Sequence, residues 1–172
     1  DSLQQHFDDT IKGGHNAAEQ DLVAQMVTDG PAAIRWLIGL GMTFDLAAGS
    51  DNNGRLQRKR AGGTSIPRVL CYRDFTGLEM MRVLREAVEL ERGITQLNRC
   101  PAIELLSDEH GRCVGAVLYD LERRKLLIVH AKSVVLASGG SGRLHLQGFA
   151  TSNHYGATAD GLVMAYRMGA KL

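Results

Sequence analysis

The residues with the clearest chemical potential are four small ones that follow an apolar run. Residues 134–136 are Val-Val-Leu, and they lead directly into Ala137, Ser138, Gly139 and Gly140. Small residues after a strand leave backbone N–H groups uncovered, which lets a phosphate or the edge of a nucleotide approach the backbone. A tight turn after a strand also needs glycine, so this segment alone is equally typical of a plain turn.

A second candidate site opens the last helix that the sequence predicts. Thr158, Ala159, Asp160 and Gly161 place the Asp160 carboxylate at the N-terminal end of that helix, where the helix dipole favours negative charge. A carboxylate there can accept hydrogen bonds from a ribose or a polyol chain. The alternative is that Thr158 or Asp160 does no more than cap the helix.

The cysteines indicate neither a disulfide framework nor a metal site. Cys71, Cys100 and Cys113 are odd in number and form no C-x-x-C pair. Packed free thiols in a reducing compartment fit this pattern better than disulfides, and zinc would need more ligands at tighter spacing. We therefore predict no metal site.

Composition excludes several functional classes. The 172 residues carry 20 Lys and Arg against 19 Asp and Glu, a net charge of +1, so we expect no nucleic-acid partner. A hydrophobic fraction of 44% with 23% charged residues is that of a globular protein. No apolar run reaches the ~20 residues that cross a bilayer. The N-terminus lacks the pattern of a signal peptide and does not begin with Met, so we expect a longer gene product.

A basic cluster lies near the middle of the chain. Arg55, Arg58, Lys59 and Arg60 fall within six residues, and no aromatic residue lies among them. This pattern is typical of a solvated face. A contact with an anion or a carboxylate is the alternative interpretation.

Helices are predicted for the first half of the chain. Apolar spacing indicates one helix over residues 1–11 and a second that begins after Asn16 as its N-cap. Gly30-Pro31 should end that second helix, with Pro31 beginning a third that runs to Gly39. A further helix is expected over residues 74–92, capped by Asp74 or Thr76.

Short strands are predicted for the second half. A different pattern begins at residues 103–106. The apolar runs that follow at residues 114–118 and 126–129 favour strands joined as a hairpin. The continuous run over 133–137 predicts a strand covered on both faces, and residues 159–168 predict a helix that ends at Gly169. The predicted fold class is α/β: N-terminal helices, a small antiparallel β-meander, a buried strand and a C-terminal helix.

Five motifs occur in a recognisable order: Asp9-Thr10-Ile11-Lys12-Gly13-Gly14, Ala61-Gly62-Gly63, Asp74-Phe75-Thr76-Gly77, Ala137-Ser138-Gly139-Gly140 and Ala157-Thr158-Ala159-Asp160-Gly161. Over the whole chain this series resembles the flavoprotein subunit family of fumarate reductase, succinate dehydrogenase and L-aspartate oxidase. The resemblance implies that residues 1–172 are the central part of a Rossmann-like FAD-binding domain. The implied reaction is hydride transfer between FAD and a dicarboxylate such as fumarate or succinate.

The resemblance also implies the residues that contact FAD. Ala137, Ser138, Gly139 and Gly140 match a turn beside the flavin, where Ser138 replaces the usual Thr and keeps its hydroxyl. Asp160 matches an acidic residue that contacts FAD, although Ala159 stands where the family usually has Gly. Ala102 falls where the backbone of the family meets the adenine ring.

The substrate-proximal residues implied by the resemblance are Ala61, Gly62 and Gly63. Ala61 stands where fumarate and succinate enzymes often carry Phe and aspartate oxidases carry Glu. Small, uncharged Ala61 leaves the substrate open and argues against an aspartate oxidase.

Several parts of the family are absent from these 172 residues. They are the N-terminal strand with G-x-G-x-x-G, the His that carries covalent FAD, the H-P-T motif, and the capping domain with its proton-donating Arg. We therefore assign no catalytic residue, and we expect the chain alone to be inactive and to bind FAD weakly or not at all.

The resemblance implies two kinds of partner, a dicarboxylate substrate and an iron–sulfur or other electron-transfer subunit. It implies a cytoplasmic protein held peripherally at the inner membrane face through that subunit. The alternative is a non-enzymatic nucleotide-binding or protein-interaction domain that retains the flavin-domain shape. A flavin enzyme of the same wider family that acts on amino acids or ketosteroids is a third interpretation.

Overall fold

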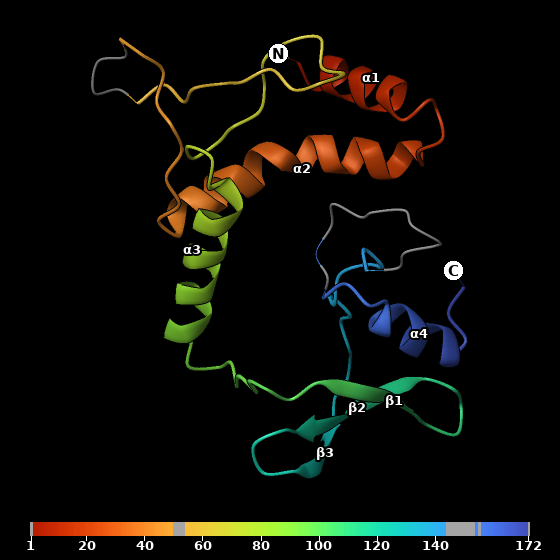
Figure 1. Cartoon of the computed structure of the whole chain (residues 1–172). Coiled ribbons are helices and arrows are strands. Elements are labelled where there is room, and N and C mark those ends of the chain that lie inside the picture. The colour runs from red at the N-terminus through yellow and green to blue at the C-terminus, as the bar shows by residue number, and fades with distance from the viewer. Residues whose placement is uncertain (1, 50–53, 144–153, 155, 172) are drawn as a thin grey trace. The chain divides into compact units, whose positions relative to one another are not determined.

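The computed structural model describes residues 2–49, 54–143, 154 and 156–171 (Figure 1). The chain divides into two compact units, Asp1–Thr95 and Gln96–Leu172. The first unit holds three helices, and the second holds a three-stranded sheet and a helix. No helix in the described ranges is both long enough and apolar enough to cross a membrane.

The first helix, α1 (Leu3–Gly13), has a hydrogen bond at each end that involves a residue just outside it. Ser2 is its N-cap, and the Ser2 hydroxyl accepts a hydrogen bond from the Gln5 N–H at 3.0 Å. The helix ends where the Asn16 N–H bonds back to the carbonyl oxygen of Ile11 at 3.0 Å. The predicted helix over residues 1–11 is therefore confirmed. Asn16 has a φ of 60° and closes α1, so the prediction that it caps the next helix is wrong.

The second helix, α2 (Gln20–Gly39), runs through Gly30-Pro31 without a break. The prediction of two separate helices is wrong here. A residue before proline normally avoids the helical conformation, partly because its Cβ meets the proline ring. Gly30 has no Cβ, so it removes that clash, and only the hydrogen bond that Pro31 cannot donate is lost.

The third helix, α3 (Thr76–Leu90), lies within the predicted span and completes the core of the first unit. Its N-cap is Phe75, with no side-chain capping bond, so the predicted cap by Asp74 or Thr76 is wrong. Leu37 from α2, Val83 from α3, and Met42 and Phe44 between these helices form a buried cluster. The loop between α2 and α3 is held by two isolated antiparallel bridges, Leu46 with Leu56 and Lys59 with Val69.

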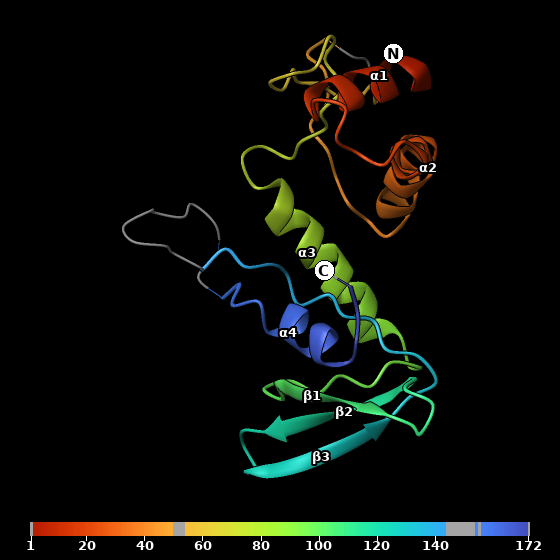
Figure 2. The same cartoon turned by 90° about the vertical axis from the view of Figure 1, so that its right-hand side faces the viewer.

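The second unit is built on an antiparallel sheet with the order β1-β2-β3 (Figure 2). Its strands are β1 (Ala102–Ser107), β2 (Cys113–Asp120) and β3 (Lys125–His130). The hairpin closes with Asp120 opposite Lys125, as the sequence predicts. Helix α4 (Asp160–Arg167) packs on β1 and buries Met164. The β-meander and the C-terminal helix of the predicted fold class are thus confirmed.

The prediction of a buried strand over residues 133–137 is wrong for this structure. These residues pair with no strand within the described ranges, and the side chains of Val135 and Leu136 are 87% and 40% exposed. A strand covered on both faces needs neighbouring strands and helices over both faces. The second unit provides one three-stranded sheet, which residues 133–137 do not join.

Candidate functional site

Two motif segments of the second unit lie in direct contact. The Ala159 N–H donates to the carbonyl oxygen of Gly140 at 3.1 Å. Gly161 lies so close to Ser138 that a Cβ built on Gly161 would stand 2.0 Å from the Ser138 hydroxyl oxygen. The two candidate sites found separately in the sequence are therefore adjacent and make up one candidate site.

The turn at Ser138–Gly140 leaves its backbone open to a ligand. Gly139 has a φ of 81°, which glycine adopts without strain. Among the residues that the structure describes, no atom lies within 4 Å of the positions that a Cβ would take on Gly139 or Gly140. Within the described residues, the N–H groups of Ser138, Gly139 and Gly140 make no hydrogen bond. Uncovered N–H groups beside free space fit a nucleotide or phosphate edge.

At the start of α4 the side chain of Asp160 does not cap the helix. Ala159 occupies the N-cap position with no side-chain capping bond, and Asp160 is the first helical residue. The Asp160 carboxylate is exposed and accepts a hydrogen bond from the Thr158 hydroxyl. The alternative in which Thr158 or Asp160 merely caps α4 is therefore wrong. The carboxylate has further acceptor positions that a ligand hydroxyl can use.

We expect Ala159→Gly to stabilise the chain. Ala159 has a φ of 64°, a left-handed conformation that costs an L-residue about 1–2 kcal/mol. Glycine removes this cost but gains freedom in the unfolded state, so the net gain should be about 0.5–1 kcal/mol. Urea denaturation of the wild type and the variant measures it. An unchanged or lower free energy of unfolding would show that Ala159 is not strained.

Ala102 lies apart from the turn but on the strand that supports the same helix. It is the first residue of β1, pairs with Leu118 of β2 and is half-buried. Because β1 packs against α4, Ala102 begins the strand that supports the helix of Asp160. The turn at Ser138–Gly140 and the segment that carries Asp160 are thus in direct contact. Ala102 is connected with them only through the packing of β1 against α4.

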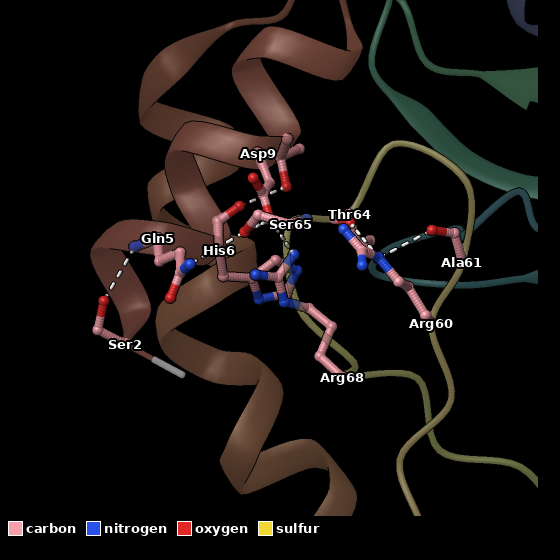
Figure 3. Close-up of polar contacts among 10 residues, drawn as sticks. Ser2, Gln5, His6, Asp9, Arg60, Ala61, Thr64, Ser65 and Arg68 are labelled. Atoms are coloured by element: carbon pink, nitrogen blue, oxygen red, sulfur yellow. Dashed lines mark hydrogen bonds and ion pairs between the residues drawn. The ribbon is translucent and has the colours of Figure 1, made fainter.

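In the first unit, Ala61, Gly62 and Gly63 form a tight turn (Figure 3). The carbonyl oxygen of Ala61 accepts two bonds from Thr64, one from its N–H at 3.3 Å and one from its hydroxyl at 2.9 Å. Gly63 has a φ of 79°, and Arg60 Nε donates to the Thr64 carbonyl oxygen at 3.1 Å. One member of the basic cluster thus braces the turn that it precedes.

The turn continues into a polar cluster centred on Asp9 of α1 (Figure 3). The Oδ2 atom of Asp9 accepts from the Ser65 N–H at 2.9 Å, the Ser65 hydroxyl at 2.8 Å and Arg68 Nη1 at 2.6 Å. Sequence reasoning recognised Asp9 as part of a motif but did not connect it with Ser65 or Arg68. The bonded residues are 56 to 59 positions apart in the sequence, so local residue spacing cannot predict these contacts.

These hydrogen bonds lower the pKa of Asp9 to about 2, from an ordinary value of 3.8. The Ser65 N–H is the largest cause, followed by the Arg68 guanidinium and the Ser65 hydroxyl. All three donors favour the ionised carboxylate. The pKa of His6, on the same helix, is lowered by burial and by the positive charge of Arg68.

We expect the stability that the Asp9 contacts contribute to fall progressively as the pH drops from about 4 to about 2. Because the pKa of Asp9 is lower in the folded chain, the stabilisation is complete above the unfolded pKa. It disappears as the pH falls through the folded value of about 2. Glu79 and Asp108 also have lowered pKa values, so a site-specific measurement is needed. NMR titration of the Asp9 carboxyl carbon should give a midpoint near 2, and a midpoint near 3.8 would contradict the prediction.

The three cysteines form no disulfide, and the contacts of Cys71 are with neighbouring side chains. All three are free thiols, and buried Cys71 donates to Asp45 Oδ2 at 3.4 Å. The side chain of Cys71 also raises the pKa of Lys59. Among the residues that the structure describes, no group of three or more His, Cys, Asp or Glu side chains is placed to hold a metal ion.

Comparison with known proteins agrees with this geometry. The sequence profile of a family described as FAD binding domain matches residues 1–172. An L-aspartate oxidase of Streptomyces coelicolor is 37% identical over all of the chain, which covers 29% of that enzyme. An FAD-dependent oxidoreductase of Methanocaldococcus jannaschii is 35% identical over the whole chain, which covers 30% of that protein. The solved structure of E. coli quinol fumarate reductase matches 97% of the chain, with a TM-score of 0.87 and 29% identity.

The chain thus spans less than a third of the length of the relatives it matches. The likeness to E. coli quinol fumarate reductase extends through both units, since it covers nearly all of the chain. The match over all residues includes the turn at Ser138–Gly140, Asp160 and the turn at Ala61–Gly63.

Proposed function

Because this chain belongs to the family of FAD-binding domains, we propose that it supplies flavin-contacting and substrate-proximal segments to an FAD-dependent oxidoreductase of the fumarate reductase and succinate dehydrogenase type. The observation that carries the proposal is the contact of Ser138 with Gly161 and of Gly140 with Ala159. It joins two nucleotide-type motifs into one surface. Both the family match and the named relatives favour an enzyme over a non-enzymatic binding domain.

The open turn and the start of α4 fit the polar parts of FAD. The N–H groups of Ser138, Gly139 and Gly140 would donate to acceptors of the cofactor, because they make no hydrogen bond among the described residues and no side chain beside Gly139 or Gly140 blocks an approach. The Asp160 carboxylate would accept hydrogen bonds from its hydroxyl groups. When bound, the flavin supplies hydride transfer, and the chain's residues hold and orient it. We assign no residue of the chain as a proton donor.

For the substrate we propose a dicarboxylate, with fumarate or succinate favoured over L-aspartate. Ala61 is small and uncharged, whereas an acidic residue at this position would suit an ammonium group. The alternative is kept open by the relative in Streptomyces coelicolor, which is an L-aspartate oxidase. On the likeness to quinol fumarate reductase we propose an electron-transfer subunit as partner, with attachment to a membrane face through it.

The test uses the FAD-loaded protein that contains this chain. Its flavin is reduced under anaerobic conditions and mixed with fumarate, and the return of oxidised-flavin absorbance is followed. We expect rapid reoxidation by fumarate and none by the monocarboxylate crotonate. Oxidation of L-aspartate with oxygen uptake, together with no response to fumarate, would replace the proposed substrate. A protein that binds no FAD would overturn the function itself.

The 172-residue chain by itself should bind FAD weakly or not at all. It carries the turn at Ser138–Gly140 and Asp160, but it contains no G-x-G-x-x-G, the motif that receives the pyrophosphate in dinucleotide-binding folds. Equilibrium dialysis of the chain against FAD measures this affinity. Micromolar binding would contradict the prediction.

A further inference from the structure

One motif residue has a clear structural setting but no role in the proposed flavin contacts. Asp9 lies on α1, and its carboxylate bonds to Ser65 and Arg68, which are 56 and 59 residues further along the chain. We propose that Asp9 is a positioning residue that fixes the substrate-proximal turn Ala61–Gly63. This inference rests on the proposed function of that turn.

The first argument is the strength of the bonds from Ser65 and Arg68 to Asp9, which we call the anchor. Three donors converge on the single Oδ2 atom of Asp9, and two of them belong to Ser65. The side chains of Asp9 and Arg68 are only 15% and 9% exposed, so water competes little for their ion pair. Gln5 Nε2 donates to the Ser65 hydroxyl at 3.0 Å and adds a second link between α1 and the loop.

The second argument is that the other bonds of the turn are local. They join Thr64 to Ala61 and Arg60 to Thr64, so they shape the turn but do not attach it to another element. No atom of the described residues lies within 4 Å of the positions that a Cβ would take on Gly62 or Gly63, so side-chain packing does not hold them. Glycine has the widest conformational freedom of any residue, so two glycines in succession make a flexible segment unless its ends are fixed. One end is fixed by the bridge of Lys59 with Val69, and Asp9 ties the other end through Ser65.

A functional consequence follows from the placement of the anchor. Ser65 is only two positions after Gly63, so its backbone N–H bond to Asp9 limits where the turn can lie. The turn is proposed to lie beside the substrate and to carry no reacting group, so its displacement should weaken binding of the substrate and of the transition state alike. Loss of the anchor should therefore raise the KM for the substrate by about tenfold, while kcat changes less.

The experiment compares Asp9→Asn with Asp8→Asn. Both substitutions remove a carboxylate from α1, but Asp8 only accepts an exposed hydrogen bond from Gln4 at 2.8 Å. Hydrogen exchange of the amides of residues 61–65 reports the anchor, and fumarate KM and kcat of the FAD-loaded protein report its effect. We expect faster exchange and a raised KM in Asp9→Asn, unchanged flavin content, and wild-type values for Asp8→Asn.

Two results would overturn the proposal: equal exchange in both variants, or a raised KM that only follows a loss of flavin. If Asp9→Asn does not fold, Ser65→Ala replaces it, because it removes the hydroxyl donor and keeps the Ser65 N–H bond to Asp9. Unchanged exchange in Ser65→Ala then counts against the anchor. If wild-type protein does not respond to fumarate, the proposed function fails, while the exchange measurement still decides whether Asp9 holds the turn.

Discussion

Gly115→Ala should destabilise the antiparallel sheet of the second unit by about 3 kcal/mol. Gly115 lies in β2 opposite His130 of β3. A Cβ on Gly115 would stand 2.1 Å from the carbonyl oxygen of Val129 and 3.1 Å from the Cα of His130. Both atoms belong to the backbone of β3, so no side-chain rotation can make room. The strands would have to separate, which breaks the ladder between them.

Gly39→Ala is the matched control for this substitution. Gly39 is the last residue of α2, and nothing lies within 4 Å of the position that its Cβ would take. Alanine in a helix is favoured over glycine by up to about 1 kcal/mol, so this variant should be neutral or slightly more stable. Urea unfolding followed by circular dichroism compares the two. A Gly115→Ala chain as stable as the wild type would show that β2 and β3 do not approach as closely as the structure has them.

The parts of the fold that the sequence predicts correctly are those that local patterns determine. The apolar repeat of α1, the span of α3 and the end of α4 at Gly169 each depend on residues within one or two helical turns. The β2–β3 hairpin is likewise local, because few residues separate its strands. Such elements can be derived from spacing alone, whereas the N-caps predicted for α2 and α3 are wrong.

Two of the wrong predictions, the helix break at Gly30-Pro31 and the buried strand over residues 133–137, depend on context that spacing does not contain. Gly30-Pro31 is a strong break signal, yet a glycine before the proline permits the helical backbone of α2. The run over residues 133–137 has the composition of a buried strand, but burial depends on what lies on either side of it. Val135 is 87% exposed because the described part of the chain supplies neither a partner strand nor a cover.

In the candidate site, too, local patterns predict the residues but not the contacts between distant segments. Motif order identified Ser138, Gly140 and Asp160, and the family match now includes them. Their mutual contact could not be predicted, since about 20 residues separate the two segments and a loop of that length fixes no geometry. The bonds of Asp9 to Ser65 cross an even longer stretch and follow only from the folded chain.

Gly161→Ala should lower the flavin affinity of the FAD-loaded protein by at least about tenfold, which corresponds to about 1.4 kcal/mol. Gly161 is buried at the start of α4. A Cβ there would stand 2.0 Å from the hydroxyl oxygen and 3.2 Å from the Cβ of Ser138. Rotating the Ser138 hydroxyl relieves the first contact but not the second. The Ser138 end of the turn must then shift by a few tenths of an ångström relative to α4, which disturbs the common arrangement of the turn N–H groups and the Asp160 carboxylate.

A double-mutant cycle with Ser138→Gly separates this clash from a general loss of stability. Ser138→Gly removes both atoms that the new Cβ would meet, so adding it to Gly161→Ala should restore much of the flavin content. Contacting residues typically show coupling energies of about 0.5–3 kcal/mol in such cycles. Flavin absorbance relative to protein absorbance measures occupancy in the four proteins. Additive losses would mean that Ser138 and Gly161 act independently, and the flavin surface would then not depend on the contact between these two segments.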